Sequence, residues 1–175
     1  MINNEVIKAL VERRSVRSYK DTPIPNEILD EILKAGTYAP TGRNRQAPII
    51  IAVTDKALRD RLSRINASIM GTESDPFYGA PTVLVVLCDK SIPTYVYDGS
   101  LVMGNLLNAA HALGVAGCWI HRAKETFEMP EWKEWLKSIG IEDEVEGIGN
   151  LILGYPATEY PAPKPRADGR VFRVE

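Results

Sequence analysis

Apolar residues recur at helical spacing in two stretches near the start of the chain. The first stretch follows Asn3 and Asn4, and asparagine is a favoured helix N-cap, so we expect a helix to begin after one of them. The second begins at Pro25, which suits the first position of a helix, and ends near Gly36. The two apolar stripes consist of Val6, Ile7, Leu10 and Val11, and of Ile28, Leu29, Ile32 and Leu33.

Short, continuous apolar runs predict strands. Residues 49–53 lie between Pro48 and Asp55 and predict a strand buried on both faces. Helices that alternate with such strands predict an α/β sandwich, whose strand order the sequence leaves open. The further strands are predicted over residues 83–87, about 115–120 and near 148–153, and the further helices around Leu58, Leu62 and Ile65, over 101–113 and over 131–138.

Two segments suggest contacts outside one folded chain. Residues 101–113 are apolar almost all round, so this helix needs burial on more than one side, and a subunit interface is a plausible second side. Residues 154–175 are rich in proline and lack periodicity, so this tail either frays or is held extended against something else. Without an internal repeat or a linker, we expect residues 1–175 to form one domain.

Composition and charge exclude several classes of protein. The chain has 175 residues, 45% of them hydrophobic and 25% charged, which is typical of a globular protein. A net charge of −2 argues against a nucleic-acid binder, which usually needs a basic face. We expect no membrane span and a cytoplasmic location, because polar residues interrupt the apolar stretch 101–119 and no signal sequence opens the chain. Cys88 and Cys118 are expected to be buried free thiols rather than metal ligands.

Common catalytic motifs are missing from the sequence. It contains no G-x-x-x-x-G-K-S/T phosphate loop, no strand-linked G-x-G-x-x-G, no G-x-S-x-G and no H-E-x-x-H. Neither an ordinary nucleotide fold nor hydrolysis by a triad or a metal is therefore supported. His111 lies on an apolar helix and is expected to be a hydrogen-bonded core residue.

A basic cluster closes the first predicted helix. Residues 13–17 read Arg-Arg-Ser-Val-Arg, and such cations are often solvated charges that favour the helix dipole. Alternatively, guanidinium groups and a serine hydroxyl suit an anion such as a phosphate. A second basic pair, Lys164 and Arg166, lies in the tail and by itself would be read as solvated charge.

A polar loop lies between the second helix and the first strand, over residues 38–46. It is rich in turn formers, but Asn44 and Gln46 also carry amides that can pair with a heterocycle. Two basic clusters and one amide-bearing loop could converge on a phosphorylated ring cofactor.

Motifs in a fixed order along essentially the whole chain resemble the flavin-dependent nitroreductase family. They are Arg13-Arg14-Ser15-Val16-Arg17-Ser18-Tyr19, the run from Ile28 to Ala35, Ala39-Pro40-Thr41-Gly42 with Asn44 and Gln46, Ala80-Pro81, Leu113 to Ile120, and Gly154-Tyr155-Pro156 leading to Lys164-Pro165-Arg166. One departure is Gln46-Ala47-Pro48, where the family often has Gln-Pro-Trp, so an aromatic wall of the substrate pocket is missing.

The resemblance implies a three-layer sandwich with a mixed, mainly antiparallel sheet, and an intertwined homodimer with FMN at each interface. The cofactor-binding residues that it implies are Arg13, Arg14, Ser15, Arg17, Pro40, Thr41, Gly42, Asn44, Gln46, Asn66, Trp119, Ile120, His121, Lys164 and Arg166. The two basic clusters would hold the phosphate and the pyrimidine edge, and the loop would approach the ring from the partner subunit. Backbone groups around Ile120 and His121 would face the reactive side of the ring, and Asn66 would lie near the pyrimidine.

The implied activity is NAD(P)H-dependent reduction of nitroaromatic, quinone or related acceptors by a ping-pong mechanism. The flavin would carry the chemistry, so no catalytic side chain and no metal is expected. Two alternatives remain open: another flavin redox reaction on the same scaffold, such as enone or flavin reduction, and a non-catalytic FMN carrier or sensor.

Overall fold

The computed structural model describes residues 3–142 and 144–175. At its centre lies a sheet with the strand order β1-β2-β4-β3, in which neighbouring strands are antiparallel. The strands are β1 (Pro48–Val53), β2 (Thr82–Asp89), β3 (Ala116–Ile120) and β4 (Val145–Gly154). Ser15 forms an isolated parallel bridge to Gly117, outside the four strands, whose pairings with one another are antiparallel rather than mixed.

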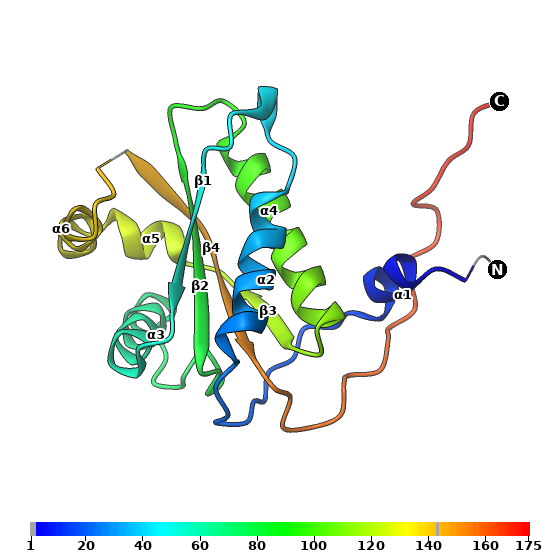
Figure 1. The fold of residues 1–175 in the computed structure, drawn as a ribbon, viewed down its shortest axis with the longest axis horizontal. Helices are drawn as coiled ribbons and strands as arrows, with labels where there is room; N and C mark the ends of the chain where they lie inside the picture. The colour runs from blue at the N-terminus through cyan, green and yellow to red at the C-terminus, as the bar shows by residue number, and fades with distance from the viewer. Residues whose placement is uncertain (1–2, 143) are drawn as a thin grey trace.

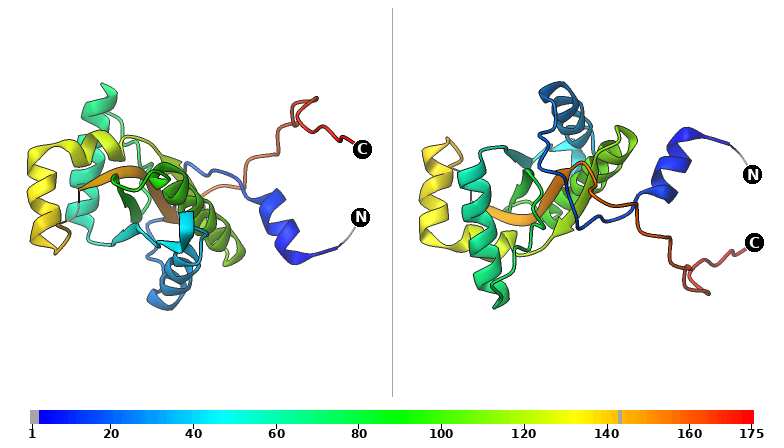
Figure 2. Two further views of the ribbon diagram at one scale, coloured as in Figure 1. Left: turned by 90° about the horizontal axis from the view of Figure 1, so that it is seen from above. Right: turned by 90° about the horizontal axis from the view of Figure 1, so that it is seen from below.

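Helices cover both faces of the sheet (Figure 1). On one face lie α2 (Asn26–Thr37) and α4 (Tyr95–Ala112). On the other face lie α3 (Lys56–Met70), α5 (Ala123–Glu128) and α6 (Pro130–Ser138). Views from above and below show the same arrangement (Figure 2), which confirms the three-layer sandwich.

The central strand β2 supplies both halves of the hydrophobic core. Successive residues of a strand point to opposite sides, so alternate side chains of β2 serve the two faces. Val83, Val85 and Leu87 face α3, α5 and α6, whereas Leu84 and Val86 face α2 and α4.

Several local predictions are confirmed. Asn4 caps α1 (Glu5–Glu12), and its Oδ1 accepts hydrogen bonds from the N–H groups of Val6 and Ile7. Both cysteines are buried free thiols. Pro25 is the N-cap residue of α2 rather than its first helical residue.

Other local predictions were wrong or incomplete. The strand expected to be buried on both faces, β1, is an edge strand that is mostly half-buried, because only β2 flanks it. The helix expected over 101–113 begins earlier, at Tyr95. Helix α5 was not predicted at all.

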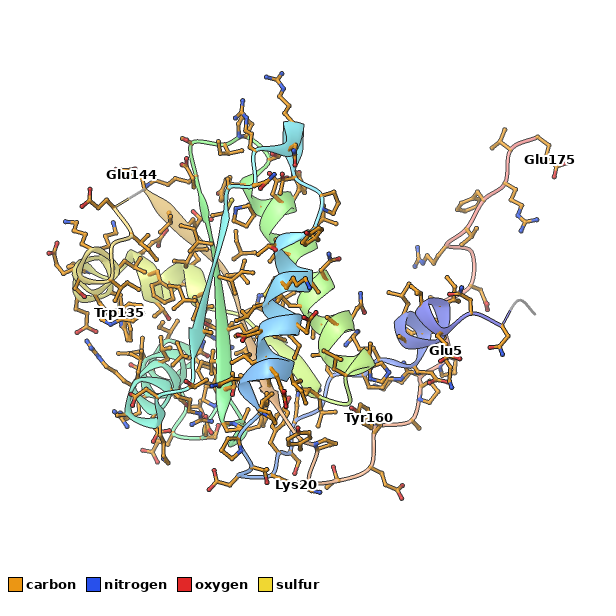
Figure 3. All side chains as sticks on the ribbon, viewed as in Figure 1. Glu5, Lys20, Trp135, Glu144, Tyr160 and Glu175 are labelled. Carbon is orange, nitrogen blue, oxygen red and sulfur yellow. The ribbon has the colours of Figure 1, made fainter. Side chains whose placement is uncertain are left out.

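Helix α1 and the tail leave the body of the molecule on the same side (Figures 1 and 2). The apolar stripe of α1 is exposed, with Val6 67% and Val11 62% accessible to solvent. Residues 157–175 are exposed as well, and Figure 3 shows Glu175 far from the sheet. The face of α1 that its periodicity predicts to be buried therefore stays largely uncovered by the residues that the structure describes. In the part of the chain that the structure describes, no helix is both long and apolar enough to cross a membrane.

The segment between α1 and α2 runs along the free edge of β3. The Val16 N–H donates to the Gly117 carbonyl at 3.3 Å, and the Lys20 N–H donates to the Tyr155 carbonyl at 2.8 Å. The Tyr19 hydroxyl donates to the Val16 carbonyl at 2.6 Å, and burial raises the pKa of Tyr19 well above its usual value, so this donor stays neutral. The first basic cluster and the start of the tail are thereby fixed beside β3.

Candidate functional site

The first basic cluster contains guanidinium nitrogens that have no partner. Arg13 is the C-cap residue of α1, where the chain leaves the helix and turns toward β3. Nη1 of Arg13 and Nε of Arg14 are shielded from solvent and lack a hydrogen-bond acceptor among the described residues. The Arg14 Nη1 donates to the carbonyls of Val11 and Arg13 at 2.7 and 2.8 Å. Shielded cationic groups are costly unless an anion completes them, so this cluster fits a phosphate.

His111 adds a third shielded nitrogen in the same region. Its Nδ1 is buried without a partner among residues 3–142 and 144–175, so the expectation of a hydrogen-bonded core residue was wrong. Burial lowers the pKa of His111, the nearby Glu12 carboxylate raises it, and Arg13 and Arg14 lower it further. The imidazole is therefore held in its neutral form while the arginines lack an anion.

The tail begins beside this cluster. The ring of Tyr160 meets the ring of His111 edge-on, with centroids 5.6 Å apart, where the tail passes the end of α4 (Figure 3). Beyond Tyr160, Lys164 and Arg166 are exposed, and neither forms an ion pair with a described residue. The structure thus brings the start of the tail to the first basic cluster but leaves the two tail cations in solvent.

The polar loop is held in an unusual backbone conformation. Arg43, Asn44 and Gln46 have φ values of 55°, 54° and 52°, in the left-handed region that side chains other than glycine rarely adopt. The Gln46 N–H donates to Oγ1 of Thr41 at 3.0 Å. The Gln46 side-chain amide donates to Oδ1 of Asn44 at 3.2 Å, so these two exposed amides pair with each other.

Asp98, which sequence reasoning missed, ties the loop to the first turn of α4. It is 3% exposed; its Oδ1 accepts the Gly42 N–H at 2.9 Å, and its Oδ2 accepts the Thr94 hydroxyl at 3.0 Å. The sequence signal was a carboxylate three residues before the apolar run 101–113. Pro40, within this loop, is exposed.

The turn after β3 contains a small buried polar network. Asn66 on α3 and Asn150 on β4 both donate to the His121 carbonyl, at 2.7 and 3.3 Å. Asn66 therefore lies under this turn, where its amide donates to a protein carbonyl. Arg122 donates to Oδ1 of Asn66 at 3.3 Å and has a left-handed φ of 76°. Sequence reasoning missed Arg122 and Asn150, although an asparagine inside an apolar strand is a signal for a specific partner.

The side chains of Trp119 and Ile120 point in opposite directions. Ile120 is buried against α3 and α5, so only its backbone is available to a ligand. Trp119 is half-buried on the side of α4, and its Nε1 is shielded without a partner among the described residues. The His121 side chain is exposed, with its ring centroid 6.2 Å from that of Trp119.

Within one chain the polar loop and the first basic cluster lie at opposite ends of α4. Asp98 holds the polar loop at the first turn, whereas His111 in the last turn lies beside the basic cluster. Asp98 and His111 are 13 residues apart, which is about 20 Å along a helix, so a single chain does not bring the loop to the arginines.

Comparison with known proteins identifies the family. Residues 10–76 match the model of the nitroreductase family. A putative NADH dehydrogenase/NAD(P)H nitroreductase of Archaeoglobus fulgidus is 31% identical over 160 residues, which cover 89% of this chain and 87% of the relative. This chain belongs to the nitroreductase family. Its fold agrees with the crystal structure of a Bacteroides fragilis nitroreductase with bound FMN, at a TM-score of 0.89, 29% identity and 99% and 100% coverage of the two chains. An FMN reductase [NAD(P)H] of Bacillus subtilis is 29% identical, with 93% of this nitroreductase and 70% of the relative covered.

Proposed function

We propose that this nitroreductase binds FMN and uses NAD(P)H to reduce nitroaromatic, quinone or related acceptors. The observation that carries the proposal is the set of shielded, unpartnered nitrogens of Arg13 and Arg14, which call for an anion at the edge of β3. The similar proteins from Bacteroides fragilis and Bacillus subtilis, described respectively as having bound FMN and as an FMN reductase, support a flavin phosphate as that anion. Because NAD(P)H is an intracellular reductant, we propose the cytoplasm as the place of the reaction.

The residues of this chain supply binding, orientation and charge. Arg13, Arg14 and Ser15 hold the phosphate, and Lys164 and Arg166 close on it when the tail is ordered. Arg17 places a cation at the pyrimidine edge of the ring, where negative charge accumulates on reduction, and a fixed cation stabilises that charge without reorganisation. When bound, FMN would supply the redox chemistry itself, namely hydride uptake from NAD(P)H and electron delivery to the acceptor.

The working unit of this proposal is a homodimer. The exposed stripe of α1 and the extended tail need a cover, and the polar loop lies at the other end of α4 from the arginines of its own chain. A second copy of the chain supplies the cover and the missing loop. Its surface buries α1, and its polar loop brings Thr41, Asn44 and Gln46 to the ring. Asp98 then acts through the loop by holding it in its left-handed conformation.

The test starts with the purified chain and added FMN. We expect tight binding of FMN, followed by steady oxidation of NADH or NADPH when menadione or nitrofurazone is the acceptor. Binding without NAD(P)H oxidation would instead identify an FMN carrier. Failure to bind FMN would overturn the proposal as a whole.

A further inference from the structure

The His121–Arg122 peptide is fixed from the inside of the molecule. Asn66 is completely buried and Asn150 is 2% exposed, yet both direct their amide nitrogens at the same carbonyl, that of His121. They come from α3 and β4, elements on two sides of the turn. Two buried amides that converge on one carbonyl hold that oxygen toward the protein interior.

This arrangement fixes where the next N–H points. The peptide is planar and trans, so the carbonyl of His121 and the N–H of Arg122 point in opposite directions. The carbonyl of Arg122 is held too, by the N–H and the hydroxyl of Thr126 at 3.0 and 2.8 Å. With the carbonyls on both sides of its Cα fixed, Arg122 is kept at φ 76°, and its N–H has no acceptor among residues 3–142 and 144–175.

The unpaired N–H follows one end of β3, and the basic cluster lies beside the other end of that strand. Ser15 bridges to Gly117, near the start of β3, and Arg122 follows the end of that strand. Five residues span at most about 17 Å, a distance that a ribityl phosphate and a three-ring system can bridge. A phosphate at the arginines and a ring at the turn are thus compatible with one ligand lying along β3.

We propose that Asn66 and Asn150 are positioning residues that aim the Arg122 N–H at the ring of the bound flavin. This inference rests on the proposed function and adds to it a role for two buried amides in setting the flavin's reduction potential. The ring nitrogen that accepts hydride is a hydrogen-bond acceptor only in the oxidised state. A fixed N–H donor therefore favours the oxidised state, and losing its fixed orientation raises the potential.

The test uses Asn66→Leu and Asn150→Leu, which remove the amides while keeping side chains of similar size. The matched control is Asn105→Leu, because the Asn105 amide also donates to a backbone carbonyl, that of Ala35 at 3.0 Å, but lies on α4 away from the turn. In the reconstituted holoprotein we expect each turn variant to raise the midpoint potential of bound FMN by about 30 mV or more. For a two-electron couple this equals a tenfold change in the ratio of affinities for oxidised and reduced flavin. The control should leave the potential unchanged.

Unchanged potentials in both turn variants, with FMN still bound, would overturn the inference and leave the proposed function intact. A wild-type chain that binds no FMN would instead overturn the proposed function. Should the variants fail to fold, the backbone amide resonance of Arg122 in wild-type protein decides. Its proton should shift and become protected from exchange when FMN is added and not when phosphate alone is added. An amide that does not respond to FMN would overturn the inference.

Discussion

At the scale of single residues, the guanidinium groups of Arg13 and Arg14 are the least satisfied charges at the edge of β3. Removing one should weaken a ligand that carries a phosphate and spare one that does not. We expect Arg13→Ala to weaken FMN binding by about 1.5–3 kcal/mol, the contribution of a charge-assisted hydrogen bond. This is about a 10- to 100-fold rise in Kd. Titrations of wild type and variant with FMN and with riboflavin measure the Kd of each ligand.

Riboflavin is the control because it lacks the phosphate, so its affinity should stay nearly the same in the variant. Added FMN should also raise the Tm of the variant less than that of wild type, because ligand binding stabilises the folded state by mass action. Equal losses for FMN and riboflavin would show that Arg13 does not hold the phosphate.

Asp75 is a residue whose ionisation stabilises the fold away from the site. Burial alone would raise its pKa, but hydrogen bonds from Ser63, Arg59, Gly79 and Phe77 outweigh burial and place the pKa below its usual value. The folded pKa is therefore lower than the unfolded one. The carboxylate contributes stability at pH values above the unfolded pKa of about 3.9, and this contribution is lost as the pH falls through the folded pKa.

We expect Asp75→Asn to lower the free energy of unfolding by about 1.5–3 kcal/mol at pH 7, because it removes one of the two carboxylates, those of Asp60 and Asp75, that pair with the buried Arg59. At pH 3 the difference from wild type should shrink. Urea unfolding at the two pH values measures this, with the exposed Asp30→Asn as the control. An equal loss of unfolding free energy at both pH values would show that the ionised Asp75 carboxylate is not what stabilises the fold.

At the scale of elements, hydrophobic periodicity predicted those helices and strands whose pattern is contained in one segment. It missed features that are set by contacts with neighbouring elements. The apolar run of β2 and the stripes of α1 and α2 were enough to place these elements. The run of β1 did not reveal that it is an edge strand, because burial of both faces depends on which elements cover it. Helix α5 has only six residues, and burial of Ala123 and Phe127 against β4 determines it rather than a long apolar stripe.

The same limit applies to the candidate site. Sequence motifs singled out the arginines and the amide-bearing loop as candidate cofactor-binding residues. They did not indicate Asp98, Asn150 or Arg122, because the roles of these residues arise from contacts between segments far apart in the chain. A buried polar residue within an apolar run is the signal to look for in such cases.

The crossing of β4 and α5 gives an element-scale prediction. A Cβ at Gly147 would overlap the backbone of Ala123, directly after Arg122, so glycine allows α5 to approach the strand. We expect Gly147→Ala to destabilise the protein by about 1–3 kcal/mol, as overpacking typically does. Thermal or urea unfolding measures this loss. Wild-type stability in the variant would mean that α5 does not lie against β4 in solution.

At the scale of the whole molecule, the exposed stripe of α1 distinguishes a monomer from a dimer. In the isolated chain Leu10 is 48% exposed, so Leu10→Glu should be tolerated. In the proposed dimer the same carboxylate lies in an apolar interface, and an interface of obligate type exceeds about 1,600 Å². We therefore expect Leu10→Glu to produce monomers that bind FMN weakly.

Sedimentation of the variant at micromolar concentration measures this change. Ile139→Glu is the matched control, because Ile139 is 46% exposed at the end of α6, on the far side of the sheet from α1 and the tail (Figure 1). A wild-type monomer with FMN bound would contradict the dimer.

The most direct test of the central claim is anaerobic titration of the FMN-loaded protein with NADH and with NADPH. The account predicts that at least one of them bleaches the flavin absorbance at one equivalent per bound FMN, and that nitrofurazone or menadione restores it. Bound flavin that dithionite reduces but neither nicotinamide nucleotide bleaches would contradict the account.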